Sequence, residues 1–360
     1  MFFQATADAS SAKKRPQLVA WQGRWTAGAT MATARQFHTA TLLENGAVLA
    51  VGGTSVSGDL ASVELYDPAS NLWRAASPLT TARYYHSATR LNNGCVLVAG
   101  GFSGVPLSDA ELYDPAANRW RAAGSMSAVR GLHSATLLAG GHVLLIGGNA
   151  ADGACSGAEM YDPACNAWRR SRSLSAGSDY HTASRLKDQG VLLAGGAGPR
   201  GAVNSVELYD PVWNTWRNAQ SLLNQRLRHT ATLLSDGRLL VAAGDDGASN
   251  YLLSAELYDP IGHQWSPAGS LLSGREYCTT TLLSQDRVLI VGGDGSAGRL
   301  ASAEMYDAAA NVWLTAGHLT EARYLHTATR LLDGRVLIAG GVGTRGALKS
   351  AEIFGLTETR

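Results

Sequence analysis

One pattern recurs along this chain at a nearly constant spacing, and it constrains the fold more than any other feature. Six of the seven copies carry a histidine, in most copies preceded three residues earlier by an arginine, and successive copies lie 47 to 49 residues apart. The landmark positions are His38, His86, His133, His181, His229 and His326, with Cys278 in the remaining place. Self-similarity at a period of this length is typical of repeat architectures, in which one supersecondary unit recurs.

Each copy predicts four short antiparallel strands. The residues after the histidine form the first strand, and a turn such as Asn45-Gly46 then gives the strongest hairpin signal that a sequence offers. The second strand is apolar and ends in two glycines, the third carries a Glu-Leu-Tyr run, and an Asp-Pro turn leads into a fourth strand with a tryptophan. A four-stranded unit of about 45 residues without helical periodicity indicates a propeller blade.

The two ends of the chain are expected to complete one ring. The seventh copy supplies only three strands, whereas Trp25 stands before any complete copy. Residues 21–27 therefore predict the fourth strand of the last blade, a pairing that would hide an aggregation-prone edge. We expect an all-β, seven-bladed β-propeller over residues 21–360, after a poorly ordered extension over residues 1–20. Its blades would begin near residues 35, 83, 130, 178, 226, 275 and 323.

The landmarks also resemble those of a known repeat. Two glycines, a tyrosine and a tryptophan recur at fixed offsets in nearly every copy. The first two copies place them at Gly52-Gly53, Tyr66 and Trp73, and at Gly100-Gly101, Tyr113 and Trp120. This arrangement resembles the kelch repeat over about residues 21–355. The resemblance implies a kelch-type propeller, but such propellers serve as protein-binding modules, oxidases, isomerases and lyase-like specifiers, so the fold does not fix the function.

Composition narrows the class of partner. Charged residues make up 16% of the chain and the formal net charge is +1, so the sequence predicts no nucleic-acid footprint. No apolar run approaches the length of a membrane span, and residues 1–20 do not resemble a signal peptide. We expect a cytoplasmic monomer whose cysteines are free thiols in a reducing compartment. The cysteines are Cys95, Cys155, Cys165 and Cys278.

The residues that recur most strictly are interpreted as scaffold. A residue present in every blade serves what every blade needs, and buried charges must be paired or hydrogen-bonded. The repeated arginines are Arg35, Arg83, Arg130, Arg226, Arg275 and Arg323, and the repeated glutamates are Glu64, Glu111, Glu159, Glu207, Glu256, Glu304 and Glu352. With the histidines and the tryptophans they predict a structural network and a packed core.

Two positions in each blade vary, and hairpin geometry places both on the same face of the ring. One follows the landmark arginine: Gln36, Tyr84, Gly131, Asp179, Leu227, Glu276 and Tyr324. The other follows the glycine pair: Thr54, Phe102, Asn149, Ala197, Asp245, Asp294 and Val342. Variation within a repeat array marks adaptation to a partner. In kelch proteins that bind peptides the corresponding positions line the mouth of the central channel, and the resemblance implies the same here.

The predicted mouth is uneven. Its aromatic side contains Gln36, Phe37, Tyr84, Tyr85, Phe102 and Tyr324. Its acidic side contains Asp179, Tyr180, Asp245, Asp246, Glu276, Tyr277 and Asp294, with Arg228 and Arg275 among the acids, and Asn149 is a further candidate. The departures from the repeat also lie on the acidic side: Ser178 replaces an arginine, Cys278 a histidine and Ala243 a glycine. They represent either drift within the repeats or a site for an organic cation, an amine or a metal.

Two kinds of function fit this mouth. The first is a binding module that captures a small molecule or a peptide segment. The second is a small-molecule enzyme of isomerase, lyase or cyclase type, with Asp179 and Glu276 as acid or base and Tyr84 or Tyr324 as proton donor. Acids that converge in a desolvated mouth are expected to have raised pKa values. Kelch copper oxidases use a Tyr/His copper site, and because the repeated histidines here belong to the scaffold, we expect no metal and no cofactor.

Overall fold

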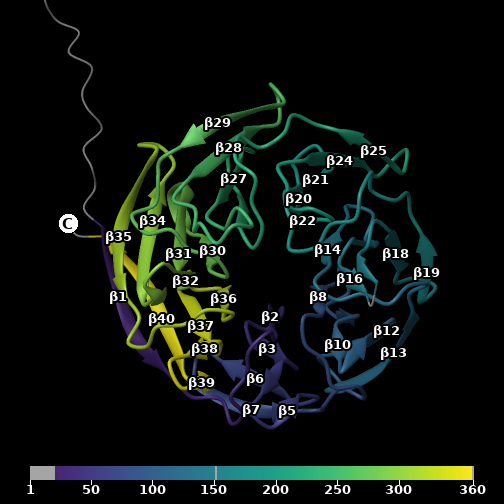
Figure 1. Ribbon diagram of the computed structural model, residues 1–360. Helices are drawn as coiled ribbons and strands as arrows, with labels where there is room; N and C mark the ends of the chain where they lie inside the picture. Colours follow the sequence, from purple (N-terminus) through teal and green to yellow (C-terminus); the bar gives the residue numbers. More distant parts are fainter. Residues whose placement is uncertain (1–20, 151, 359–360) are drawn as a thin grey trace, which may run out of the picture.

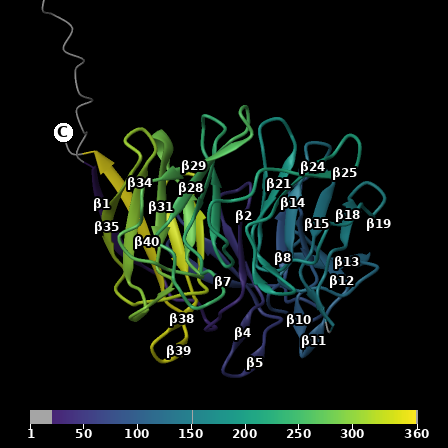
Figure 2. The same cartoon turned by 45° about the horizontal axis from the view of Figure 1, so that its top comes forward.

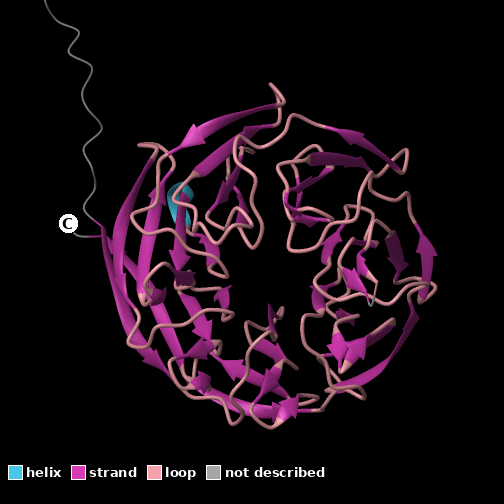
Figure 3. Cartoon of the chain, in the orientation of Figure 1, coloured by secondary structure: helices cyan, strands magenta, loops and turns pink. Residues whose placement is uncertain are grey.

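The computed structural model describes residues 21–150 and 152–358, which form a ring of seven four-stranded antiparallel sheets (Figure 1). The all-β, seven-bladed propeller that the repeats predict is therefore confirmed. Loops and strands account for nearly all of the ring, and the described residues contain one 3-10 turn, η1 (Ser284–Asp286) (Figure 3). None of these residues belongs to a helix of the length and apolar character that a bilayer requires. The predicted extension over residues 1–20 lies outside the described residues.

The two inner strands of each blade are short. The innermost strands are β2 (Thr39–Leu42), β8 (Ser87–Arg90), β14 (Ser134–Leu137), β20 (Thr182–Arg185), β26 (Thr230–Leu233), β30 (Thr279–Leu282) and β36 (Thr327–Arg330). The second strands are fully buried: β3 (Val48–Val51), β9 (Val96–Ala99), β15 (Val143–Ile146), β21 (Val191–Ala194), β27 (Leu239–Ala242), β31 (Arg287–Val291) and β37 (Val336–Ala339). All seven second strands are apolar except at Arg287 of β31, because they pack against neighbouring blades on both faces.

The two outer strands complete each blade. The third strands carry the repeated glutamate: β6 (Val63–Asp67), β12 (Asp109–Asp114), β18 (Ala158–Asp162), β24 (Val206–Asp210), β28 (Ala255–Asp259), β34 (Ser302–Asp307) and β40 (Ala351–Glu358). The outermost strands carry the tryptophan: β7 (Leu72–Ala76), β13 (Arg119–Ser125), β19 (Ala167–Arg170), β25 (Thr215–Asn218), β29 (Gln264–Ala268), β35 (Val312–His318) and, for blade seven, β1 (Trp21–Gly28). The first and last strands of the chain thus share one blade.

The ring is closed by β1, which runs antiparallel to β40 along its whole length and pairs Trp25 with Phe354. The Trp25 indole N–H donates to the Ala316 carbonyl oxygen of blade six at 2.9 Å, and its ring lies 5.0 Å from that of Phe354. Equivalent tryptophans such as Trp73 and Trp120 also donate to a carbonyl of the preceding blade. The tryptophans therefore hold neighbouring blades together at the rim.

The repeated histidines form a second ring of contacts next to the channel. Each histidine Nε2 lies 2.8 to 3.2 Å from a Ser or Thr hydroxyl on the innermost strand of the preceding blade. The six pairs are His38–Thr327, His86–Thr39, His133–Ser87, His181–Ser134, His229–Thr182 and His326–Thr279. Burial lowers the pKa of His86, His133 and His326 to about 3 and that of His181 to about 4, so these rings stay neutral.

The landmark arginine is fully buried and joins several segments. In blade one, the Arg35 guanidinium donates to the Gly52 and Ser62 carbonyl oxygens at 2.7 and 3.1 Å and to the Glu64 carboxylate at 2.7 Å. The second glycine of the pair, Gly53, donates to the backbone carbonyl of Arg83 in the next blade at 2.8 Å. A Cβ on Gly52 would lie 2.5 Å from that carbonyl, which explains the glycine. The interpretation of these residues as scaffold is confirmed.

One face of the ring carries small hairpins that follow the glycine pairs (Figure 2). Six blades have such a hairpin: β4 (Thr54–Ser55) with β5 (Gly58–Asp59), β10 (Phe102–Ser103) with β11 (Val105–Pro106), β16 (Asn149–Ala150) with β17 (Gly153–Ala154), β22 (Ala197–Gly198) with β23 (Gly201–Ala202), β32 (Asp294–Gly295) with β33 (Gly298–Arg299), and β38 (Val342–Gly343) with β39 (Gly346–Ala347). Blade five instead has a longer loop, in which Asp245 bridges to Tyr251. We call this face the mouth of the channel.

The neutral histidines predict marked acid sensitivity. Histidines in the unfolded chain titrate near pH 6.5, so below that pH the unfolded state binds more protons than the folded state. The free energy of unfolding should therefore fall as the pH drops from about 6.5 towards 3, by up to about 1.4 kcal/mol per pH unit for each histidine. Urea denaturation at pH 7.5, 6 and 5 measures this. A flat profile over that range would contradict the assignment of the ring as buried and neutral.

Candidate ligand-binding site at the channel mouth

The two variable positions of each blade are direct backbone partners. In all seven blades the residue after the landmark arginine forms an isolated antiparallel bridge with the residue after the glycine pair. The pairs are Gln36–Thr54, Tyr84–Phe102, Gly131–Asn149, Asp179–Ala197, Leu227–Asp245, Glu276–Asp294 and Tyr324–Val342. Both positions therefore lie on one face of the ring, and each blade presents two adjacent variable positions at the mouth.

A third position per blade has an unusual backbone. The second residue after the landmark arginine has φ between 49° and 57° in every blade, which is the left-handed region. These channel positions are Phe37, Tyr85, Leu132, Tyr180, Arg228, Tyr277 and Leu325. In five places the backbone N–H of a channel position donates to the carbonyl oxygen of the preceding one, at 3.1 to 3.3 Å. The same left-handed backbone conformation occurs in all seven blades. It sets the direction of the side chain at each channel position.

Three tyrosines from alternate blades meet across the channel. The Tyr85 ring of blade two packs edge-on against Tyr180 of blade four with centroids 6.4 Å apart, and Tyr180 packs against Tyr277 of blade six at 6.0 Å. Burial and hydrogen bonding among the three hydroxyls raise the pKa of Tyr85 and of Tyr277. The ribbons leave an opening at the centre of the ring (Figure 1), and the three rings come from blades on different sides of it. We call Tyr85, Tyr180 and Tyr277 the tyrosine floor.

A cation is already built into the acidic side. The Arg228 guanidinium carbon lies 4.9 Å from the Tyr180 ring centre and 5.0 Å from that of Tyr277. The same group bonds the Glu276 carboxylate at 3.0 Å and the Asp245 carboxylate at 3.4 Å. Burial alone would lower the pKa of Arg228, but Tyr277, Glu276 and Asp245 together raise it. Arg228 therefore remains charged and links the floor to the acids.

Glu276 and Asp245 form a coupled carboxyl pair. Both are buried, with side chains 11% and 5% exposed. Burial and a hydrogen bond to Asp245 raise the pKa of Glu276 to about 7, although Arg228 acts in the opposite direction. Burial also raises the pKa of Asp179. The expectation that acids in this mouth have raised pKa values is confirmed for these two, and Glu276 titrates in the range that acid/base chemistry uses.

Two further acids lie at the mouth without a cation of their own. The Asp179 carboxylate accepts a hydrogen bond from the Asn149 amide at 2.8 Å. The Asp294 carboxylate lies 3.4 Å from the Tyr251 hydroxyl. Among the described residues, neither carboxylate takes part in an ion pair, whereas the Arg299 guanidinium of blade six stacks on Tyr324 at 5.5 Å. The acidic side therefore carries more carboxylates than guanidinium groups.

The aromatic side is one contiguous cluster. The Phe37 ring lies 4.1 Å from Tyr85 and 6.1 Å from Tyr84, centre to centre. Tyr84 lies 5.7 Å from Phe102, its partner in the backbone bridge. All four rings are half-buried, as is Gln36 beside them. We call Phe37, Tyr84, Tyr85 and Phe102 the aromatic wall.

Two of the predicted site residues lie elsewhere. Asp246 points away from the carboxyl pair, because its carboxylate accepts hydrogen bonds from the Ala248 and Asn250 backbone and from the Asn250 amide. These bonds shape the loop of blade five and lower the pKa of Asp246. Cys278 is buried in a core cluster that also contains Ala243, and burial raises the pKa of its thiol to about 12. Asp246 therefore does not join the carboxyl pair, and Cys278 lies in the core.

Cys278 and Ala243 compensate for each other. In the other blades, a Cβ on the first glycine of the pair would approach the histidine of the next blade, at 3.1 Å between Gly52 and His86. Blade five carries Ala243 at that position, in the left-handed region with φ of 64°, and blade six carries the smaller Cys278 in place of histidine. The two departures from the repeat are therefore one packing adjustment.

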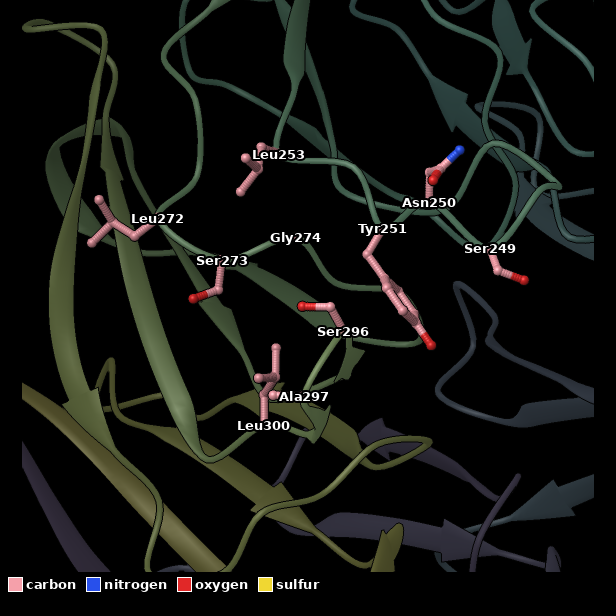
Figure 4. A pocket seen from close by; sticks show the side chains of 10 residues that line it. All are labelled: Ser249, Asn250, Tyr251, Leu253, Leu272, Ser273, Gly274, Ser296, Ala297 and Leu300. Carbon is pink, nitrogen blue, oxygen red and sulfur yellow. The ribbon is translucent and has the colours of Figure 1, made fainter.

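Sequence reasoning missed several residues at the mouth. Leu132 and Leu325 complete the set of channel positions, and Arg299 and Tyr251 contact predicted residues. Tyr251 also lines a cavity of about 520 Å³ between blades five and six, with its ring extending away from Leu253 and Leu272 (Figure 4). The sequence does carry a signal for the channel positions. The residue before each landmark histidine varies as much as the residue after the arginine and the residue after the glycine pair. Tyr251 had no such signal.

The described residues hold no group of three or more His, Cys, Asp or Glu side chains arranged to bind a metal ion. The histidine Nε2 atoms are engaged by hydroxyls, and the carboxyl pair is engaged by Arg228. The mouth therefore offers charge, hydrogen bonds and aromatic faces as its chemistry.

The titration of Glu276 is directly measurable. Carboxyl carbon resonances of a ¹³C-Glu-labelled protein should show one glutamate with a midpoint near pH 7, because burial and Asp245 disfavour its charge. Glu276→Gln should remove that resonance, whereas Asp245→Asn should shift its midpoint downwards because a neutral amide replaces a like charge. A glutamate set that titrates entirely below pH 5.5 would contradict this geometry.

The compensating pair predicts a large coupling. Cys278→His alone should destabilise the protein by about 1–3 kcal/mol, because the imidazole would be overpacked against Ala243. The double variant Ala243→Gly/Cys278→His restores the pattern of the other blades and should recover most of that loss. Urea denaturation of the four proteins gives the coupling energy. Additive effects within about 0.5 kcal/mol would show that the two positions are independent.

Comparison with known proteins supports the architecture. The kelch motif profile matches residues 45–80, 82–127 and 226–272. A fungal alcohol oxidase of the AA5 family, solved in complex with copper, superposes with a TM-score of 0.77 at 17% identity over 92% of this chain and 76% of its own. YjhT superposes with a TM-score of 0.62 at 16% identity over 79% of this chain and 98% of its own. No curated protein sequence matches the chain. At such identities the structural likenesses show the fold alone, which is a β-propeller, and the motif matches identify kelch motifs in three segments of this chain.

Proposed function

We propose that the mouth of this propeller binds a small molecule or a peptide segment that presents a positive charge beside an aromatic or apolar group. The observation that supports this most directly is the asymmetry of the mouth. Buried and half-buried carboxylates gather on blades four to six, and an aromatic wall faces them from blades one and two. Kelch propellers are suited to binding because their blades present variable residues on a rigid ring.

The charge balance favours a cationic ligand. Asp179, Asp245, Glu276 and Asp294 share the acidic side with two guanidinium groups, that of the half-buried Arg228 and that of Arg299, which stacks on Tyr324. Asp179 and Asp294 are free to accept further hydrogen bonds from a positively charged donor. A partly desolvated carboxylate gains more from such a partner than one in bulk water, because the surrounding dielectric is low.

The aromatic residues favour a ligand with a flat or apolar part. The tyrosine floor and the aromatic wall offer ring faces at the same mouth. Binding is favoured when a ligand covers half-buried aromatic rings. Tyr180 and Tyr277 already hold one guanidinium between them, which demonstrates that rings at this depth can face a cation. The same contacts make Arg228 a fixed wall of the site.

Substitutions at the mouth should reduce binding and leave folding intact. Ligands can be found by incubating the purified protein with a peptide library and with a metabolite extract, followed by native mass spectrometry. We expect the captured compounds to carry a positive charge. Asp179→Asn and Tyr84→Phe should each weaken binding about 5- to 50-fold, in line with the loss of one hydrogen bond to a charged group. The melting temperature should change little because neither side chain belongs to the repeated scaffold.

Asp236→Asn provides a matched control, since Asp236 is an acid on the tight turns of the opposite face and pairs locally with Arg238. It should leave ligand affinity unchanged. If Asp179→Asn and Tyr84→Phe lower the melting temperature by several degrees without any effect on captured ligands, these residues belong to the scaffold and the site is elsewhere. Capture of predominantly anionic compounds would overturn the charge argument.

A second function is favoured by one observation, the pKa of Glu276 near 7. A carboxyl group that is half protonated at neutral pH can both donate and accept a proton, as an isomerase, lyase or cyclase requires. Burial raises the pKa of Tyr84, which keeps that hydroxyl protonated as a donor. Tyr324 and Asp179 lie at the same mouth. Consumption of a metabolite by the wild-type protein but not by Glu276→Gln, with a pH dependence centred near 7, would establish this function.

A further inference from the structure

Blade four lacks the cation that the other six blades bury. In those six, the landmark arginine forms an ion pair with the repeated glutamate, with N–O distances from 2.5 to 3.1 Å. The pairs are Arg35–Glu64, Arg83–Glu111, Arg130–Glu159, Arg226–Glu256, Arg275–Glu304 and Arg323–Glu352. In blade four Ser178 takes the place of the arginine, but Glu207 is retained. The six complete blades are internal templates for what blade four has lost.

Glu207 is buried, with 6% of its surface exposed, and among the described residues no cation lies within ion-pair distance of it. Its hydrogen bonds come from the Ser175 backbone N–H, at 3.2 Å to each oxygen, and from the Ser175 hydroxyl at 2.9 Å. A buried carboxylate without a counter-charge is unfavourable, so a cation that reached it would be bound with a substantial gain in free energy.

The remaining acceptors of the missing guanidinium are also in place. In blade five the Arg226 guanidinium donates to the Ala243 and Ser254 carbonyl oxygens, to the Ser254 hydroxyl and to Glu256. The blade-four residues at these positions are Gly195, Ser205 and Glu207, so two carbonyl oxygens, a hydroxyl and a carboxylate converge there. The Ser178 hydroxyl reaches only the Gly195 carbonyl oxygen, at 3.3 Å. We call this set of acceptors the blade-four slot.

The slot opens to solvent. Ser205 is exposed, whereas the serines at the same position of the complete blades are half-buried: Ser62, Ser254, Ser302 and Ser350. In those blades the arginine donates to the serine hydroxyl and covers it. The exposed Ser205 is therefore the side from which a small group would approach the acceptors.

We propose that the blade-four slot binds a guanidinium group supplied by a ligand, either an arginine side chain of a peptide or a free guanidino compound. A planar fork of N–H donors is the shape that these acceptors hold in six sibling blades, and a guanidinium matches it where a compact ammonium does not. The blade-four slot is distinct from the candidate site at the mouth, although Asp179 follows Ser178 directly in the chain. It therefore goes beyond the proposed binding of a cation at the mouth and can be tested independently.

The test uses methylguanidinium chloride at 0 to about 20 mM against sodium chloride at equal ionic strength, with the melting temperature as readout. Ligand binding to the folded state alone should raise the melting temperature of the wild-type protein by about 1–2 °C in a saturable way. Ser178→Arg should raise the melting temperature without ligand and abolish the response, because its own guanidinium fills the slot. Methylammonium should have little effect.

Two further variants keep the test decisive. Arg226→Ser reproduces the blade-four arrangement in blade five and should roughly double the response if it folds. Glu207→Gln removes the counter-charge and should eliminate the response while Asp179→Asn, a change in the mouth, retains it. A wild-type protein whose response equals that of sodium chloride, or a response that survives Glu207→Gln, would overturn the proposal. A response lost in Asp179→Asn but kept in Glu207→Gln would assign the cation to the mouth.

Discussion

The architecture depends on the burial of one arginine per blade. A guanidinium taken out of water is stable only if its charge is paired and most of its N–H groups are hydrogen-bonded, and six blades supply the same glutamate and the same two carbonyl oxygens. One of those carbonyls belongs to the first glycine of the pair. The second glycine donates to the backbone carbonyl oxygen of the arginine in the next blade. Each arginine therefore links segments of its own blade through its side chain and the preceding blade through its backbone. The repeated arginine and glutamate follow from that requirement.

The requirement also determines where the chain is free to vary. Because the arginine is fixed by its buried partners, the next two residues are held at the edge of the channel, one in a backbone bridge and one in the left-handed region. Neither side chain takes part in the pairing of the arginine. The fold therefore provides two positions per blade whose direction is fixed and whose identity is unconstrained, which is the condition for a binding surface on a rigid scaffold.

The period and the hairpin turns made the propeller and its mouth predictable, because the landmark residues recur in seven blades. The closure of the ring followed from the incomplete copies at the two ends. The site was predictable to the level of residues on a face, but not of contacts. Arg228 was expected among the acids, yet its position between Tyr180 and Tyr277 depends on a positive φ. The residue types at the channel positions do not predict that φ. Tyr251 was missed because blade five folds its loop differently, and the Asp246 carboxylate, which was expected among the acids, accepts hydrogen bonds from its own loop.

The three departures from the repeat have different physical consequences. Ala243 and Cys278 exchange volume across a blade boundary, so the core stays filled and no polar group loses a partner. Ser178 is different, since nothing among the described residues replaces the charge that it removes from beside Glu207. A change that exchanges volume can be neutral on its own, whereas a change that leaves a buried carboxylate unpaired must either weaken the fold or be offset by something that binds. Blade four is therefore the place where the scaffold itself, and not only its variable surface, has the properties of a site.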